Sequence, residues 1–401
     1  TRNKFSTLSD NSSMLNLPKN VWILTACLAL FMSLSVFWVF VGGFIGILLA
    51  PSESLATLPV ATIVVGTAVS IIPAIRMMSI FGRKKVFLSS CIFTILLIGL
   101  CIFSIINKSF YLFCFASFCL GGTVAVMQQF RFAAIESVNL EQRPAATAIV
   151  LLGGLISAFL GTEIATLGKD YFDTEFVGSL IILSLLFVIA FILMCFFKPT
   201  ENFNEQINNS TRPLKKIIRQ GSFIVAVCAA MTAYVVMSFV MTATPISMEH
   251  IDEFSFDDTK IVLQIHVIAM FLPSLITAYI VKYLGLTRMM IAGTLLLFIS
   301  IFIAYLSHSW WNYLFALALL GLGWNFLFLG GTNLLPLSYN ENEKFKVQSI
   351  NEFLVFGFQA FAALSAGWVL FTFSWEVVLL SVIPLLFFQL FVLLWWLKNN
   401  N

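Results

Sequence analysis

Four ionisable side chains fall inside long apolar runs of this sequence, which makes them the first candidates for chemistry: Arg131, Glu163, His266 and Glu352. A charge in the hydrocarbon of a membrane is costly, so such residues indicate an ion pair, a proton carrier or the wall of an aqueous path. A buried carboxylate and an imidazole can both exchange protons near neutral pH. The pattern therefore predicts ion-pair or proton chemistry inside a membrane, and the surrounding helices must supply its geometry.

The composition supports a membrane setting. Hydrophobic residues make up 60% of the 401 positions and charged residues only 10%, which is more apolar surface than a water-soluble fold can bury. None of the seven cysteines forms a CxxC pair, so we expect neither a disulfide framework nor a cysteine metal site. A net charge of +3 is too small to indicate nucleic acid as a partner. We expect an all-α membrane protein, surrounded by lipid and without a cofactor.

Apolar runs of about the 20 residues that cross a bilayer predict twelve transmembrane helices. Six fall in the first half, at 21–48, 55–80, 84–106, 109–136, 144–168 and 176–197. Six more fall in the second half, at 222–247, 259–283, 287–306, 310–336, 345–371 and 374–397. The expected domains are a tail 1–20, a bundle 21–197, a linker 198–221, a second bundle 222–397 and a tail 398–401. The first tail is polar and precedes a run too long for a signal-peptide core, so no cleaved signal is expected.

The basic residues predict the orientation. With Arg131 set aside, eighteen Lys and Arg residues lie at the helix ends on the side of the two termini, and three lie on the other side. By the positive-inside rule the termini are then cytoplasmic.

The two halves resemble each other at an offset of about 200 residues. Gly82 follows the second predicted helix as Gly285 follows the eighth, and Leu120–Gly122 corresponds to Leu320–Gly323. Duplicated helix bundles joined by a basic linker are typical of alternating access, because a site between two similar bodies can face either side of the membrane.

Over essentially its full length the chain resembles the major facilitator superfamily. The turn of Gly82, Arg83, Lys84 and Lys85 is similar to the back half of that family's loop motif. Ser79 stands where the family usually has an acidic residue, and Ile75 where it has the leading glycine. The resemblance implies two six-helix bundles related by a pseudo-two-fold axis.

Four longer strings are similar to one bacterial subgroup of the superfamily whose substrates are mostly unassigned: 129–134, 241–245, 264–267 and 323–328. Riboflavin importers of some bacteria are candidate neighbours of this subgroup. The resemblance implies a secondary transporter in the inner membrane of a bacterium, for which a monomer suffices.

In the superfamily architecture the fourth, fifth, tenth and eleventh helices form the inner constriction. The resemblance therefore implies a gate in which Arg131 pairs with Glu352, near Glu136. In the alternative reading Arg131 reaches the lipid headgroups and Glu352 bonds locally beside Asn351.

The fifth and eighth helices face each other across the interface of the halves in this fold. The resemblance implies that Glu163 meets His266 there, and we expect the pair to couple transport to protons. In the alternative reading His266 bonds a backbone carbonyl and Glu163 faces an open vestibule.

Aromatic and amide side chains indicate the solute site. Trp324 and Asn325 in the tenth helix are expected to stack on and hydrogen-bond a planar solute. Further residues in other helices of the expected cavity are Trp38, Gln128, Gln129 and Tyr234. Such a wall favours a small, neutral or amphipathic organic molecule. The alternative is that these side chains serve only packing.

Other function classes fit less well. A GxxxxGK[ST] phosphate loop is absent from the sequence, which argues against primary transport. The sequence also has no HExxH-like spacing, which argues against an enzyme. A membrane sensor or lipid-handling protein that keeps the fold without solute flux remains an alternative. Import of a flavin or an iron chelate and export of amphipathic compounds both stay open.

Overall fold

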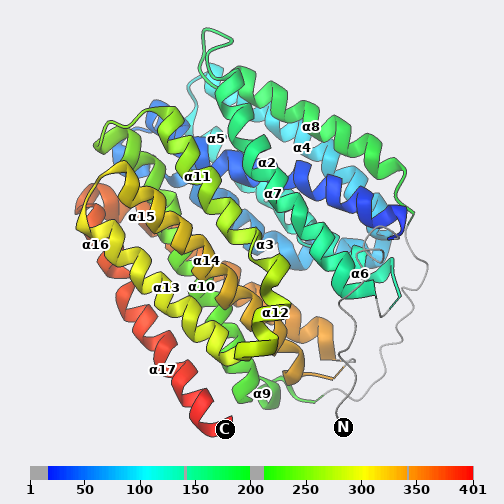
Figure 1. The fold of residues 1–401 in the computed structure, drawn as a ribbon. Helices are drawn as coiled ribbons and strands as arrows, with labels where there is room; N and C mark the ends of the chain where they lie inside the picture. The colour runs from blue at the N-terminus through cyan, green and yellow to red at the C-terminus, as the bar shows by residue number, and fades with distance from the viewer. Residues whose placement is uncertain (1–16, 140–141, 199–211, 341–342, 401) are drawn as a thin grey trace.

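The computed structural model describes residues 17–139, 142–198, 212–340 and 343–400, and every regular element within these ranges is helical. The expected tail 1–20 up to residue 16, and most of the expected linker 198–221, lie outside the described residues. The expectation of an all-α membrane protein is confirmed, and the chain runs through two groups of helices (Figure 1).

The first group holds the helices from α2 to α8. Their bounds are α2 Lys19–Leu49, η1 Glu53–Leu55, α3 Leu58–Phe81, α4 Arg83–Ile106, α5 Phe110–Met127, α6 Phe130–Glu136, α7 Arg143–Gly168 and α8 Val177–Cys195. The second group begins after a short helix, α9 Leu214–Ile217. It consists of α10 Gly221–Ile246, η3 Ser247–Ile251, α11 Phe256–Phe271, α12 Ser274–Leu284, α13 Leu286–Leu306, α14 Trp310–Leu334, η4 Leu335–Ser338, α15 Lys344–Thr372, α16 Trp375–Ser381 and α17 Ile383–Asn400.

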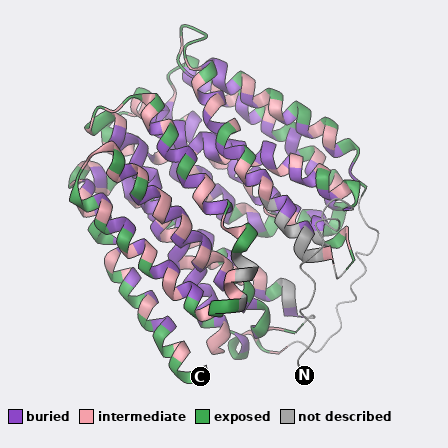
Figure 2. Ribbon diagram, in the orientation of Figure 1, coloured by how far each residue is buried: buried purple, intermediate pink, exposed green. Residues whose placement is uncertain are grey.

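Among the described residues, eleven helices are long and apolar enough to cross a membrane. The remaining expected crossing is α7, whose apolar stretch Leu152–Gly168 is shorter within those residues. Large apolar side chains are exposed along the outer faces of α8, α13 and α17, while the buried residues lie toward the inside (Figure 2). Apolar side chains on an outer face fit contact with lipid tails, and the arrangement is consistent with twelve crossings.

Some predicted spans are broken into two helices. The span expected at 259–283 is divided into α11 and α12, because Pro273 has no N–H to donate to the carbonyl four residues earlier. The span expected at 374–397 is likewise divided into α16 and α17 beside Pro384. The span expected at 109–136 is divided at Gln128 and Gln129. These breaks change the direction of a crossing without changing the number of crossings.

The start of α2 and the end of α17 lie on one side of the bundle (Figure 1). Asn20 Nδ2 donates to the carbonyl of Lys198 at 2.6 Å, so the start of α2 and the end of α8 are on the same side. We call this side, with Lys19, Lys198 and Asn400, the terminal face. The opposite side carries the loops after α2 and α7 and is called the far face.

The repeat seen in the sequence recurs in the backbone. Gly82 between α3 and α4 has φ 82°, and Gly285 between α12 and α13 has φ 79°. Each donates its N–H to the carbonyl four residues earlier, Met78 and Val281 respectively. Only glycine adopts this region of φ at low cost, so the matched glycines give both halves the same sharp turn.

Within each half the helices approach closely at glycines. A Cβ on Gly121 of α5 would collide with the backbone of α3 at Ile63 and Thr67, and one on Gly66 of α3 would collide with the carbonyl of Phe118. Close backbone packing of this kind is the main source of helix association where lipid removes the hydrophobic drive.

We predict that Gly121→Ala lowers the stability of the purified protein by about 1–3 kcal/mol, since the backbone atoms it meets have no room to move. Thermal unfolding in detergent, followed by tryptophan fluorescence, measures the effect. Gly99→Ala is the matched control, because no heavy atom lies within 4 Å of its new Cβ. Equal midpoints for the two variants would contradict the proposed tight contact.

On the terminal face, Arg212 at the end of the linker is bound to the second half by an ion pair and hydrogen bonds, which we call the clasp. Arg212 bonds both carboxylate oxygens of Glu343, at 2.6 Å for the shortest contact, and donates to the carbonyl of Ser338. The Glu343 side chain is 1% exposed. The hydrogen bonds from Arg212 lower the pKa of Glu343 from 4.5 to about 2. The clasp therefore holds the start of α10 near the start of α15.

A lowered pKa in the folded state means that ionised Glu343 stabilises the protein above about pH 4.5, and that this contribution is lost as the pH falls through about 2. We predict that the gap in thermal midpoint between wild type and Glu343→Gln is large at about pH 6 and narrower at about pH 3. Arg212→Lys, which keeps the charge and loses the two-pronged geometry, should lie between them. A gap that stays constant over this pH range would count against the clasp.

Candidate functional site

A cavity of about 230 Å³ lies between the two halves. Its wall comes from α2, α3, α5, α6 and α7 of the first half and from α10, α11, α14 and α15 of the second. Most of the wall is apolar, and its polar members are Ser35, Thr67, Gln128, Arg131, Tyr234, Ser238, Thr242, His266, Trp324 and Gln359. The volume is below the ~300–1,000 Å³ of typical ligand sites, so a drug-sized solute requires the walls to separate further.

One wall of the cavity is an aromatic cluster from three helices. Trp324 and Phe328, one turn apart on α14, stack at 4.8 Å between ring centroids. Tyr234 of α10 meets Trp324 edge-on at 5.3 Å and Phe356 of α15 at 5.4 Å. These separations are those of favourable aromatic pairs. The cluster offers a rigid apolar face against which a flat ring can lie.

The sequence analysis placed Tyr234, Trp324 and Gln128 at the solute, and all three line the cavity. It missed Phe356 and Gln359. Both follow Glu352 on α15 at intervals of four and seven residues, which places them on one face of the helix. That spacing was the available signal.

Three other expected solute residues do not line this cavity. Trp38 stacks on Phe113 at 5.7 Å inside the first half, and its indole N–H donates to Ser117 at 3.1 Å. Gln129 is turned by one helical position from Gln128, which carries its side chain away from the cavity. Asn325 donates to the carbonyl of Met270 at 2.6 Å and to Ser274 at 2.7 Å.

The contacts of Asn325 have a structural cause. They bracket the break at Pro273, where the chain leaves α11 and enters α12. An amide donor there satisfies a carbonyl that the interrupted helix exposes. We therefore assign Asn325 to the break and Trp38 to packing of the first half.

Arg131 and Glu352 form an ion pair between the two halves, with 2.8 Å between Nη2 and Oε1. Arg131 borders the cavity from α6. Glu352 contacts Arg131 from the early part of α15, so the pair lies toward the terminal face. The Glu352 side chain is 10% exposed and that of Arg131 is 27% exposed. The contact joins residues 221 apart in the sequence and closes that end of the interface.

The loop motif has a different role from the cavity. Arg83 pairs with Glu136 at 2.6 Å within the first half, and Lys84 donates to the carbonyl of Cys195 at 2.6 Å, at the end of α8. Glu136, which we expected beside the gate, is thus paired with Arg83 of the same half. A lysine at the carboxyl end of a helix satisfies a free carbonyl and complements the helix dipole. The motif of Gly82, Arg83 and Lys84 braces α4, α6 and α8 together.

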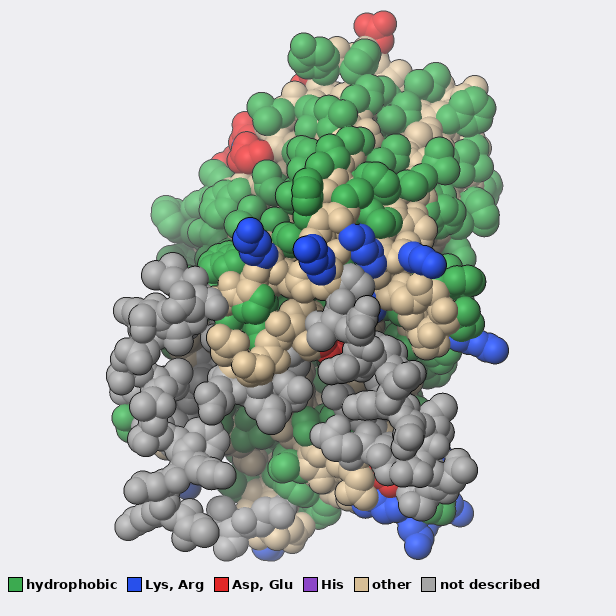
Figure 3. Space-filling view, turned by 90° about the vertical axis from the view of Figure 1, so that its right-hand side faces the viewer, with side chains coloured by type: hydrophobic (Ala, Val, Ile, Leu, Met, Phe, Trp, Pro, Cys, Tyr) green, Lys and Arg blue, Asp and Glu red, His purple; other side chains and the backbone are tan. Residues whose placement is uncertain are grey.

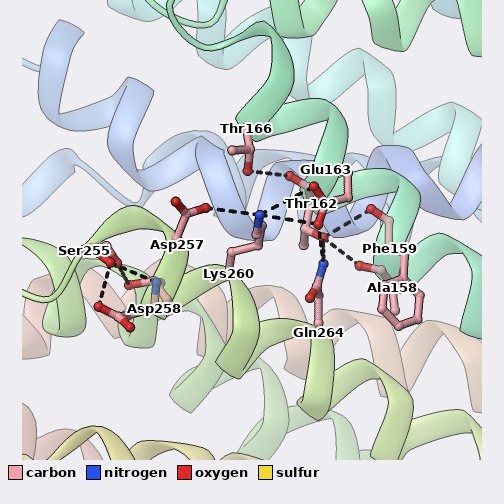
Figure 4. A network of polar contacts seen from close by, with 11 residues as sticks. Ala158, Phe159, Thr162, Glu163, Thr166, Ser255, Asp257, Asp258, Lys260 and Gln264 are labelled. Atoms are coloured by element: carbon pink, nitrogen blue, oxygen red, sulfur yellow. Dashed lines mark hydrogen bonds and ion pairs between the residues drawn. The ribbon is translucent and has the colours of Figure 1, made fainter.

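A polar network joins the halves nearer the far face (Figure 4). Lys260 Nζ lies 3.3 Å from Glu163 Oε1 and 3.1 Å from Asp257 Oδ1. Gln264 Nε2 donates to Thr162 at 2.8 Å and to Glu163 at 3.1 Å. Lys260 and Gln264 are one turn apart on α11, so both face α7.

Glu163 and His266 do not meet in this structure. His266 lies two residues after Gln264, which rotates it about 200° around α11 and turns it toward α14. There its Nδ1 contacts the carbonyl of Leu317 at 2.8 Å, as in the alternative reading of the sequence. Among the described residues Lys260 and Gln264, which the sequence analysis did not single out, are the bonded partners of Glu163 from α11.

Within the described residues no group of three or more His, Cys, Asp or Glu side chains has the arrangement of a metal site.

Comparison with known proteins gives a consistent result. A family model described as "Major Facilitator Superfamily" matches residues 21–272 and 228–401. "Riboflavin transporter RfnT" of Brucella anthropi is 30% identical over 386 residues, covering 96% of this chain and 97% of that protein. "Uncharacterized MFS-type transporter YddS" of Bacillus subtilis is 27% identical over 367 residues, covering 87% and 84%. The human organic anion transporter MFSD10 (TETRAN) superposes with a TM-score of 0.70 at 11% identity, covering 94% of this chain and 99% of that one.

We predict energetic coupling between Arg131 and Glu352. Arg131→Met and Glu352→Gln should each destabilise the protein by about 1–3 kcal/mol, because each leaves a mostly buried polar partner unsatisfied. The double variant should fall short of the sum by about 0.5–3 kcal/mol. Thermal unfolding in detergent completes the cycle. Arg76→Met, at an exposed position of α3, should combine additively with Glu352→Gln, and an additive Arg131 and Glu352 cycle would remove the interaction.

Proposed function

This chain belongs to the major facilitator superfamily, and we propose that it is a secondary transporter that carries a neutral, planar organic solute of the flavin class by alternating access. Membership makes it a membrane transporter, and the finer statement rests on the site. The observation that carries it is the cavity bounded by both halves, with an aromatic wall on one side. The name of the 30% identical relative, a riboflavin transporter, supports the flavin class.

The polarity of the cavity favours a solute without net charge. Its charged lining residue, Arg131, is neutralised by Glu352 at 2.8 Å. The remaining polar groups are amides, hydroxyls, an indole and an imidazole, which hydrogen-bond without attracting a particular ion. A flat conjugated ring gains contact with Tyr234, Trp324 and Phe356 at little cost in desolvation. We therefore propose Gln128, Tyr234 and Trp324 as solute contacts.

Polar contacts between the halves supply two latches. Arg131 with Glu352 closes the interface toward the terminal face, and Glu163 with Lys260 and Gln264 closes it toward the far face. The Glu163 side chain is 45% exposed, and pairs of that exposure contribute only about 0.2–1 kcal/mol. A latch of this strength can open in every transport cycle. We propose that the halves rock by exchanging which latch is closed.

We propose protons as the coupling ion, with Glu163 as the carrier. Protonation would remove the negative charge that holds Lys260, so the far-face latch would open with the proton in place. We expected this role of Glu163 together with His266. The contact between Lys260 and Glu163, and the bond of His266 to Leu317 instead, support Lys260 as the partner that we propose.

The distribution of charge supports the orientation. In Figure 3 the Lys and Arg side chains form a row across the middle of the visible face, with apolar side chains covering the part above the row. Such a row lies at the headgroup level of a membrane, and an apolar band lies in the hydrocarbon. We propose that the terminal face is cytoplasmic in a bacterial inner membrane and that the monomer is the transporting unit.

The test is uptake by proteoliposomes. With a pH gradient imposed, the wild type should concentrate radiolabelled riboflavin at least about tenfold above equilibration, a ratio worth 1.4 kcal/mol. Glu163→Gln should still equilibrate riboflavin but should not concentrate it, because the gradient no longer acts on the latch. Asp173→Asn makes the same change of charge in an exposed far-face loop and should behave as wild type.

The outcomes separate the readings. Riboflavin binding without flux in the wild type would favour a sensor over a carrier. Full gradient-driven accumulation by Glu163→Gln would remove Glu163 from coupling while leaving transport intact.

A further inference from the structure

Five residues that line the central cavity carry a buried polar atom with no hydrogen-bond partner. Two of these atoms, Ser35 Oγ and Arg131 Nε, come from the first half, and the other three come from the second half. The three atoms of the second half are Trp324 Nε1, His266 Nε2 and Gln359 Oε1. The three side chains line the cavity from α14, α11 and α15, and the residues are 3%, 2% and 9% exposed. Native proteins pair nearly all of their buried polar groups, so five unpaired atoms around one cavity need an explanation.

The hydrogen-bonding sense of each atom of the second half is fixed. A backbone carbonyl only accepts, so His266 Nδ1 must donate its proton to Leu317 across their 2.8 Å contact. The neutral ring then presents Nε2 as an acceptor. The indole N–H of Trp324 can only donate, and Gln359 Oε1 can only accept. These three atoms of the second half therefore offer one donor and two acceptors, to which the first half adds the Arg131 Nε–H donor and the Ser35 hydroxyl.

The positions of these atoms are also constrained. Trp324 is held between Phe328, on which it stacks at 4.8 Å, and the edges of Tyr234 and Phe271. His266 is held by its bond to α14. Both side chains line the cavity with the aromatic cluster, so a flat solute lying against the cluster would be close to them.

We propose that these three atoms read the hydrogen-bonding edge of the transported solute. Trp324 donates to a carbonyl or ring nitrogen of the solute, and His266 and Gln359 accept from its N–H or O–H groups. This inference rests on the proposed function and narrows its substrate class. The class is a neutral, flat heterocycle with a lactam or imide edge, in which an N–H stands beside carbonyl oxygens, and the flavin ring has such an edge.

The same set of one donor and two acceptors predicts which solutes bind poorly. An apolar drug leaves all three atoms unpaired, and an anion brings lone pairs against two acceptors. A site with fixed polar groups discriminates strongly against an analogue that lacks the matching group, because the group on the protein then stays buried and unpaired.

The experiment compares riboflavin with its N3-methyl derivative, in which the imide N–H is blocked. Binding to the purified full-length protein is followed by quenching of flavin fluorescence. The variants are His266→Phe and Gln359→Met, which keep the size of the side chain and remove the acceptor, and Trp324→Phe, which keeps a ring and removes the donor. Ile299→Leu, an apolar change at an exposed position of α13 outside the cavity, is the control.

Wild type should prefer riboflavin by at least about tenfold, as expected for a site built around a polar group. The imide has one N–H to donate, so the variant that removes its acceptor, either His266→Phe or Gln359→Met, should reduce the preference, and the double variant should bind both compounds equally. Trp324→Phe should weaken both compounds by the same factor, because both retain their carbonyls. A thermal scan of each variant reports whether it is folded.

Two negative results of this experiment have different meanings. If wild type binds no flavin, the proposed substrate class falls and this inference falls with it. If riboflavin binds and the double variant keeps the full preference, the reading of the edge is overturned while flavin transport stands. The control should match wild type in both affinity and preference.

Discussion

The hydrocarbon of a membrane cannot hydrogen-bond, and this one constraint organises the structure. Backbone groups must be paired inside each segment, so every regular element in the described residues is helical. Charges within the crossings must likewise find partners, and they do so where the halves meet: Arg131 with Glu352, and Lys260 with Glu163. The interface between the halves therefore carries these ion pairs, while close glycine contacts make the interior of each half tight.

Polar side chains at the interface between the halves differ in whether their hydrogen bonds are made within the protein. Outside the cavity, the side chains that cross the interface pair with one another, as Gln264 does with Thr162. Beside it, His266, Trp324 and Gln359 each keep an atom unpaired. Arg131 Nε and Glu352 Oε2, in the ion pair that joins the halves, are also unpaired. The three atoms of the cavity wall are the ones that we propose to meet the solute.

The fold was largely predictable from the sequence, because long apolar runs and basic helix ends are strong signals. The contact between Arg131 and Glu352 was also expected, although only through the family architecture, since no local pattern links residues 221 apart. Side-chain direction was the weak point. Gln128 and Gln129 differ by one helical step, and Gln264 and His266 by two, yet one of each pair borders the cavity while its neighbour faces elsewhere. Such rotations depend on which helices surround a residue, and a single sequence with twelve similar apolar runs does not determine that. Proline marks Pro273 and Pro384 as candidates for a break, but Pro73 and Pro245 lie inside the unbroken helices α3 and α10, so the missing N–H alone does not predict which spans divide.

The amide of Asn325 bonds on both sides of the corner between α11 and α12, to Met270 before it and to Ser274 after it. These two hydrogen bonds join the proline corner to α14. Trp324 precedes Asn325 on that helix, so the residue that holds the corner is the neighbour of a residue in the aromatic wall of the cavity.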